Sequence, residues 1–223
     1  MSQDYSTVGA KRKEALQKKL LEWFEKNKRD FYWRKEGVST YELLIAEMLL
    51  QKTQAEVVEP VLREFIARYP DMESVHKASR KEIEKLIWKL GLFRHRSKNI
   101  KEAAKIIVKK HGGKIEADKD WLAELPGVGA YVSSAVACFK KGERVPVVDA
   151  NVSRVVGRLF GIDYKDPKRS KELWAKAGDL VSEENPKEFN WALIDLGALV
   201  CTPGSPKCSE CPLRDECMAT QKG

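Results

Sequence analysis

The chain has 223 residues, of which 43% are hydrophobic and 33% charged, so it is long enough to bury a core and too apolar for a disordered chain. Lys and Arg exceed Asp and Glu by 41 to 33, which gives a formal net charge of +8 at pH 7. A basic surface of this kind favours a polyanion such as nucleic acid. No apolar run approaches the roughly 18 residues of a membrane span, and no secretory signal is evident. We therefore expect an intracellular protein that does not bind membranes.

Apolar residues recur with helical spacing almost throughout the chain, which predicts an all-α fold. In the first half we expect helices at 11–26, 40–52, 54–69, 72–77, 80–89 and 95–110. In the second half we expect helices at 121–125, 130–140, 150–160, 171–183 and 188–200. The run Val145-Pro146-Val147-Val148 is expected to be a buried connector, because proline is excluded from central strands.

Four of the five cysteines lie near the C-terminus with the spacing C-x6-C-x2-C-x5-C, at Cys201, Cys208, Cys211 and Cys217. Thiolates bind soft and borderline metals, and four so close in sequence can surround one site. Zinc ribbons usually bring two C-x2-C pairs, whereas only one such pair is present. A [4Fe–4S] cluster takes one cysteine per iron and tolerates unequal spacing. The spacing favours the cluster, with zinc and a metal-free segment as alternatives.

The turn Leu125-Pro126-Gly127-Val128-Gly129 separates two predicted helices. Glycine permits positive φ angles and close backbone approach. The backbone N–H groups of such a turn, at the start of the following helix, can bind a phosphate. The same letters also fit a helix stop followed by a new helix, so this motif alone does not decide the function.

Two acidic residues lie beside or within apolar segments, where a carboxylate is unusual. Asp149 directly precedes an apolar helix, which is typical of an N-cap but also of a carboxylate at the mouth of a cleft. Glu47 lies inside the apolar run LLIAEMLL, where an unpaired charge is expensive. A buried Glu47 could act as a proton donor, or it could pair with a nearby Arg or Lys.

In this order, these motifs resemble the helix-hairpin-helix DNA glycosylases that carry an iron–sulfur cluster. That family includes endonuclease III-like enzymes, adenine glycosylases and archaeal-type thymine/uracil mismatch glycosylases. The resemblance extends from Phe31-Tyr32-Trp33-Arg34 to Cys217, and it is most specific in LPGVGAYVSSAV, VDANVSRV and the cysteine spacing. It implies two lobes: a six-helix barrel lobe with the helix-hairpin-helix at 34–141, and a helical lobe at 1–33 and 142–223 that carries the [4Fe–4S] cluster loop.

The resemblance also implies roles for individual residues. After base flipping, Asp149 would stabilise positive charge on the sugar, Asn151 would support Asp149 or the attacking water, and Glu47 would assist the departing base. Family members that cut the strand have a lysine at the position of Tyr131, and a phenol cannot form the required imine. The chain is therefore expected to be monofunctional. The DNA-contacting residues would be Leu125, Gly127, Val128 and Gly129 on phosphate, with Gln51 or Lys52 at the gap left by the flipped base.

The expected partner is double-stranded DNA with a mismatched base, bound by a monomer that is DNA-associated in the cytoplasm or nucleoid. The segment Gly91-Leu92-Phe93-Arg94-His95, the Asp149-Ala150-Asn151 triplet and the end of the chain soon after Cys217 favour thymine or uracil opposite guanine over adenine. The segment Met48–Gln54 is closer to the adenine enzymes. The alternatives are an adenine glycosylase acting opposite guanine or 8-oxoguanine, and a non-catalytic DNA-binding iron–sulfur protein.

Overall fold

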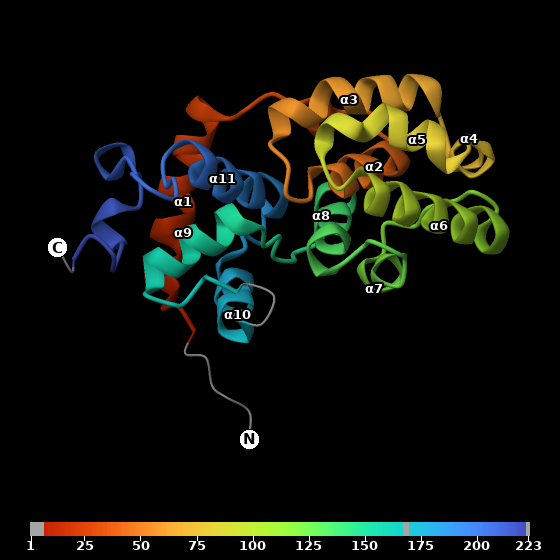
Figure 1. Cartoon of the computed structure of the whole chain (residues 1–223). Coiled ribbons are helices and arrows are strands. Elements are labelled where there is room, and N and C mark those ends of the chain that lie inside the picture. The colour runs from red at the N-terminus through yellow and green to blue at the C-terminus, as the bar shows by residue number, and fades with distance from the viewer. Residues whose placement is uncertain (1–6, 167–169, 222–223) are drawn as a thin grey trace. The chain divides into compact units, whose positions relative to one another are not determined.

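The computed structural model describes residues 7–166 and 170–221, and the chain divides into two compact units (Figure 1). We call Asp30–Lys141 the hairpin unit, and Met1–Arg29 with Gly142–Gly223 the cysteine unit. Every regular element among the described residues is an α-helix or a 3-10 helix, which confirms the predicted all-α class. None of these helices is both long and apolar enough to cross a bilayer.

The hairpin unit is built around the apolar helix α2. Its elements are η1 (Tyr32–Arg34), α2 (Thr40–Leu50), α3 (Ala55–Arg68), α4 (Met72–Lys77), α5 (Arg80–Ile87), η2 (Trp88–Leu90), α6 (Phe93–His111), α7 (Lys119–Ala123) and α8 (Ala130–Lys141). The start of α2 is fixed by a capping box in which Ser39 and Glu42 exchange hydrogen bonds. Most of α2 is buried, because it packs against α3, α6 and α8. This helix therefore forms the core on which the hairpin is mounted.

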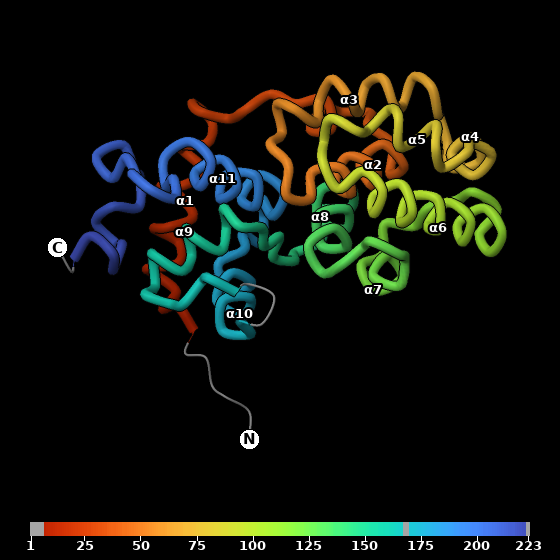
Figure 2. The backbone as a smooth tube through the Cα atoms, viewed as in Figure 1, coloured from red at the N-terminus to blue at the C-terminus, as the bar shows by residue number. Residues whose placement is uncertain are grey.

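The cysteine unit is built around α11. Its elements are α1 (Ala10–Asn27), α9 (Ala150–Phe160), α10 (Lys171–Leu180), α11 (Pro186–Leu199), η3 (Cys208–Glu210) and η4 (Arg214–Glu216). Helix α11 packs against both α1 and α9, and α10 packs against α9. From the end of α11 the backbone passes directly into the cysteine segment, drawn in blue (Figure 2).

Two buried polar side chains of α11 hold irregular segments of the cysteine unit. Asp195 is fully buried and accepts hydrogen bonds from the backbone N–H (3.1 Å) and Nε (2.7 Å) of Arg29. Asn190 accepts from the N–H of Val147 at 2.9 Å and donates to the carbonyl of Val145 at 3.1 Å. The run 145–148 is therefore an anchored connector with no strand assigned to it, as its proline predicted.

The helices lie where the periodicity placed them, with differences at a few ends. Helix α2 ends at Leu50 rather than at 52, because Lys52 has a left-handed backbone with φ of 57°. Helix α10 ends at Leu180, and α11 begins at Pro186, where proline suits the first turn of a helix. These helix ends depend on backbone conformation and on proline, which the spacing of apolar residues does not report.

Candidate functional site

Asp149 is the N-cap of α9, and its carboxylate is fixed by two donors. Oδ1 accepts the backbone N–H of Val152 at 2.7 Å, and Oδ2 accepts Nδ2 of Asn151 at 2.9 Å. Burial raises the pKa of Asp149 above its ordinary value of 3.8, although both hydrogen bonds and the nearby charge of Arg154 oppose this rise. The predicted capping role is therefore confirmed, and the cap is a carboxylate that is held in one orientation and drawn towards its protonated form.

A buried arginine connects this carboxylate to the cysteine segment. The side chain of Arg154 donates to Oδ1 of Asn151 at 2.8 Å and to the carbonyls of Cys201 at 2.6 Å and Gly197 at 2.7 Å. Asn151 in turn donates to Asp149, so a continuous chain of hydrogen bonds runs from the acid to the first cysteine. Gly197 is required here, because a Cβ at this position would lie 2.5 Å from Cβ of Asn151.

The four C-terminal cysteines are half-buried and free of disulfides. Burial raises the pKa of the Cys211 thiol to about 11, and the charges of the three other thiols raise it further. The guanidinium of Arg158 lies 3.3 Å from Sγ of Cys201. Basic charge at this position suits an anionic metal–thiolate group.

The four C-terminal cysteines fit an iron–sulfur cluster. A [4Fe–4S] cluster takes one thiolate per iron atom. Four free thiols within one short segment, with the guanidinium of Arg158 beside Cys201, supply the ligands and the compensating charge that such a cluster needs.

The two-glycine turn lies between α7 and α8 in the hairpin unit. Gly127 has φ of 80°, and a Cβ there would approach the side chain of Asn99 to 2.7 Å, so glycine is needed at this position. Leu125 and Val128 are buried, and their N–H groups already donate to main-chain carbonyls, at 3.1 Å and 3.0 Å. Gly129 is exposed at the start of α8, where the first N–H groups of a helix lack intrahelical partners.

The other predicted residues of the hairpin unit lie on α2, on α8 and in the turn after α2. Glu47 is 2% exposed within α2, and Tyr131 is half-buried in the first turn of α8, which packs against α2. Gln51 donates from Nε2 to the carbonyl of Gly127 at 2.9 Å. The turn after α2 is therefore bonded to the hairpin, and Lys52 next to Gln51 is exposed.

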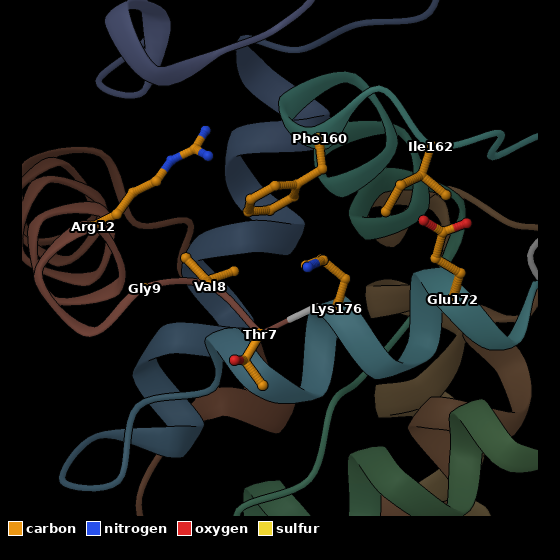
Figure 3. Close-up of a pocket in the computed structure, with 8 residues that line it drawn as sticks. All are labelled: Thr7, Val8, Gly9, Arg12, Phe160, Ile162, Glu172 and Lys176. Carbon is orange, nitrogen blue, oxygen red and sulfur yellow. The ribbon is translucent and has the colours of Figure 1, made fainter. Parts of the chain in front are cut away.

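A separate pocket of about 250 Å³ lies in the cysteine unit, between the start of α1 and helices α9 and α10 (Figure 3). Arg12 and Lys176 stand over the ring of Phe160, with the guanidinium carbon and Nζ at 5.3 Å and 5.4 Å from the ring centroid. The residues that line this pocket include none of the predicted site residues. We therefore do not assign the predicted chemistry to it.

Comparison with known families identifies the architecture. Residues 45–178, which include the hairpin and Asp149, match the family described as HhH-GPD superfamily base excision DNA repair protein. The chain belongs to this superfamily. Residues 201–217 match the iron–sulfur binding domain of endonuclease III, so this HhH-GPD protein has a [4Fe–4S] cluster as its cofactor. Cys201, Cys208, Cys211 and Cys217 are the four cysteines within that match.

Relatives in the HhH-GPD superfamily extend over most of the chain. Thymine-DNA glycosylase of Aeropyrum pernix is 37% identical over 210 residues, 92% of this chain and 94% of that protein. Thymine/uracil-DNA glycosylase of Pyrobaculum aerophilum is 39% identical over 91% of this chain and 90% of its own length. Adenine DNA glycosylase of Mycolicibacterium smegmatis is also 39% identical, over 87% of this chain but 66% of its own length. Identity alone therefore does not separate the two kinds of relative.

Solved structures agree with the fold. A thermostable thymine-DNA glycosylase superposes with a TM-score of 0.88 at 33% identity, over 96% of this chain and 98% of the other. A trapped endonuclease III–DNA covalent intermediate gives a TM-score of 0.84 at 24% identity, which supports the fold alone. The chain is thus a DNA glycosylase of base-excision repair that binds DNA and carries an iron–sulfur cluster, as the motifs predicted.

Leu92 is a further candidate residue, to which the sequence motifs assigned no contact with DNA. This residue is 60% exposed, has a left-handed backbone with φ of 48°, and is the N-cap of α6. A non-glycine residue held in this backbone region often marks a functional site, and exposed apolar side chains are used by DNA-binding proteins as wedges between base steps. An apolar residue after a glycine in the charged stretch KLGLFRHR is the signal that could have drawn attention to it.

Proposed function

We propose that this protein is a monofunctional glycosylase that removes thymine or uracil mispaired with guanine from double-stranded DNA, acting as a monomer. The observation that carries the proposal is the carboxylate of Asp149, held by Val152 and Asn151 in a chain with tyrosine at position 131. A fixed carboxylate serves glycosidic cleavage, and the absence of lysine at 131 removes the nucleophile for strand cutting.

The chemistry follows from charge. Loss of the base leaves the deoxyribose with oxocarbenium character, and an ionised carboxylate beside it lowers the barrier electrostatically. Asp149 supplies that charge, and Asn151 keeps it aimed through its 2.9 Å hydrogen bond. Glu47, buried in α2, protonates or hydrogen-bonds the departing base. The base must first leave the stack, because the sugar carbon is inaccessible in a duplex.

We assign DNA binding to the hairpin unit and to the C-terminal cysteine segment, residues 201–217. Backbone N–H groups of the turn at Gly127 and Gly129 bind a phosphate. Gln51 and Lys52 contact the gap left by the flipped base, and exposed Leu92 enters the stack as an apolar wedge. The cluster, bound by the four cysteines, ties the C-terminal segment to the body of the cysteine unit.

Asp149→Asn tests the proposed catalytic role. Asparagine is also a good N-cap, so Oδ1 can still accept the N–H of Val152 and the fold should be retained. We expect excision from a duplex with one G·T or G·U pair to fall by at least about 100-fold, with DNA affinity unchanged. The measurement is single-turnover base release scored after alkali. Retained excision in this variant would remove the mechanism.

Tyr131→Lys tests the reaction type. The wild-type protein should leave an abasic site, so strands break only after alkali treatment. An amine at 131 should attack the sugar and form an imine, which borohydride traps as a covalent protein–DNA adduct. Strand cutting by the wild-type protein without alkali would contradict a monofunctional enzyme. Tyr131→Phe is the matched control, because it alters the same ring without adding an amine.

Adenine is the second candidate base. The 39% identity to the Mycolicibacterium smegmatis adenine DNA glycosylase favours it, as does the segment Met48–Gln54. A panel of duplexes with G·T, G·U, A·G and A·8-oxoguanine separates the candidates, because pocket contacts decide which base is accepted. Faster release of adenine than of thymine or uracil would replace the first proposal with the second.

A further inference from the structure

Arg96 lies near the start of α6, and no part of the proposed mechanism uses it. Arg96 is 6% exposed, and its guanidinium donates to four acceptors outside its own helix. These are the carbonyl of Leu49, the carbonyl of Gln51 at 2.6 Å, Oγ1 of Thr53 at 2.6 Å and the carbonyl of Leu90 at 3.5 Å. Within the part of the chain that the structure describes, no carboxylate accepts from it.

The acceptors belong to two turns that share an unusual backbone feature. Lys52, in the turn after α2, has φ of 57°, and Leu92, in the turn before α6, has φ of 48°. Among the described residues these are the two non-glycine positions with positive φ. Both side chains are exposed, so neither backbone conformation is explained by packing of its own side chain.

Further hydrogen bonds bind the same segments together. Oγ1 of Thr53 donates to the carbonyl of Leu90 at 3.2 Å, which joins the two turns directly. Nε2 of Gln51 donates to the carbonyl of Gly127 at 2.9 Å, which adds the two-glycine hairpin. Arg96 therefore lies at the centre of a hydrogen-bonded group of three segments, the two turns and the hairpin, which the proposed function places in contact with DNA.

A buried guanidinium without a carboxylate is a poor choice for stability alone. Burial lowers the pKa of Arg96, which shows that its charged form is desolvated. The negative end of the α2 dipole and the bound carbonyls offset part of this cost. The planar fork of five N–H donors reaches acceptors in both turns at once, which an apolar residue cannot do and the single Nζ of a lysine cannot do in the same directions.

We propose that Arg96 is a positioning residue that holds Lys52 and Leu92 in their left-handed conformations, so that the Leu92 side chain is presented to the duplex during base excision. The proposal rests on the function proposed above. It assigns Arg96 no contact with DNA or with the reacting atoms; its effect passes through the two turns.

The same helix provides a matched control. Lys101, on α6, donates from Nζ to the carbonyls of Val75 at 3.2 Å, His76 at 2.5 Å and Ala78 at 2.5 Å. It therefore also joins a cation to the carbonyl end of a helix, α4. No non-glycine residue with positive φ lies in that segment of the described chain. Loss of Lys101 should cost stability without affecting the turns at Lys52 and Leu92.

The experiment compares Arg96→Met, Leu92→Gly, the double variant and Lys101→Met, each as full-length protein loaded with its cluster. Hydrogen exchange should show about tenfold or greater loss of protection at 51–53 and 90–93 in Arg96→Met. Single-turnover excision from a G·U duplex at saturating protein should fall about tenfold or more. Lys101→Met should lose protection at 75–78 alone and excise at the wild-type rate.

Leu92→Gly tests whether Arg96 acts through the Leu92 side chain or only stabilises the fold. Glycine adopts positive φ freely, so this variant keeps the turn but loses the side chain. It should excise as slowly as Arg96→Met, and the double variant should be no slower than either single variant. Wild-type excision by Arg96→Met, or independent multiplication of the two effects, would overturn the proposal.

Two further arms keep the result decisive. If Arg96→Met does not fold, Arg96→Lys retains the charge but not the fork, and the same loss of protection at 51–53 and 90–93 is expected. If the wild-type protein releases no base from any mispaired duplex, the proposed function fails. The exchange measurement still decides in that case whether Arg96 holds the two turns.

Discussion

Among the described residues, each unit contains one buried arginine that binds main-chain carbonyls, and the two arginines differ in what they hold. Arg154 in the cysteine unit is 8% exposed and binds the carbonyl of Cys201 and Oδ1 of Asn151, with Asp149 close enough to favour its charge. Arg96 in the hairpin unit is 6% exposed and binds three carbonyls and a hydroxyl. Arg154 therefore connects the cysteine segment to Asn151 and Asp149, whereas Arg96 connects the turn after α2 to the turn before α6.

The difference shows how one residue type serves two purposes. Burial lowers the pKa of Arg154, and the charges of Cys201 and Asp149 offset part of this effect. Loss of Arg154 would release both the acid and the cysteine segment. Arg96 lies among neutral acceptors, so its loss would free backbone turns but leave no acid misplaced. We therefore expect larger effects on chemistry in the cysteine unit and smaller effects, felt through DNA, in the hairpin unit.

The largest effect is expected for Arg154→Met. The variant leaves the half-buried carbonyl of Cys201, the buried carbonyl of Gly197 and the side chain of Asn151 without their donor, at up to about 1–3 kcal/mol for each group. Excision from a G·U duplex should fall at least about 100-fold, because Asn151 no longer holds Asp149. Urea unfolding of the holoprotein, iron content and single-turnover base release measure the three consequences.

Arg12→Met is the control for this variant. Arg12 is also in the cysteine unit and donates to the carbonyl of Glu216 at 2.9 Å, but it is exposed and distant in sequence from the acid segment. It should change unfolding by about 1 kcal/mol or less and leave excision intact. Wild-type rates in Arg154→Met would show that Asp149 is held without the arginine.

The next effect is expected for Gly197→Ala. The added Cβ would lie 2.5 Å from Cβ of Asn151 and 3.0 Å from its backbone, so Asn151 must move. A displacement of about 1 Å at a catalytic group can cost about 100-fold in rate. Gly178→Ala in α10 meets only Pro146 at 3.6 Å, an ordinary contact, and should excise normally. Equal rates in the two variants would mean that the Asn151 position does not matter.

These residues also show which parts of the site the sequence could predict. The spacing of apolar residues placed the helices, and Asp149 was recognised as a cap because it directly precedes an apolar run. The cysteine spacing favoured an iron–sulfur cluster but left zinc and a metal-free segment open, and the resemblance to the glycosylase family implied the cluster that the comparisons support. Arg154 lies among Val152, Val155 and Val156 on the buried face of α9, so the same periodicity could have marked it as a buried charge.

Arg96 and Leu92 lay beyond such reasoning for a physical reason. Arg96 stands in the basic run RHRSK, where one arginine looks like the next, and its burial depends on carbonyls about 45 residues away in sequence, such as that of Gln51. The positive φ of Leu92 is a property of the turn and not of leucine. Tertiary hydrogen bonds decide both features, and local patterns do not contain them.

In the hairpin unit, Gly127→Ala should reduce DNA binding by about tenfold. Alanine at φ of 80° costs about 1–2 kcal/mol, and its Cβ would lie 2.7 Å from Asn99. The turn would shift its N–H groups away from the phosphate. Gly129→Ala meets nothing within 4 Å and should bind almost normally. Titration at two salt concentrations measures the change, and equal affinity in both variants would argue against the turn as the phosphate site.

The smallest effect is a shift in pH dependence, measured after each variant's rates are normalised to its own maximum, and it distinguishes the two units. Asp149 must be ionised to stabilise positive charge, so excision falls as the pH drops through its pKa, and burial sets that acid limb above 3.8. The bond from Asn151 lowers this pKa, so Asn151→Ala should raise it and move the limb to higher pH. Gln51→Ala, which loses a bond in the hairpin unit, should lower the rate at every pH without moving the limb. Asn151 hydrogen-bonds the Asp149 carboxylate, whereas Gln51 does not. If the acid limb moves in both variants, or in neither, the group that titrates is not Asp149.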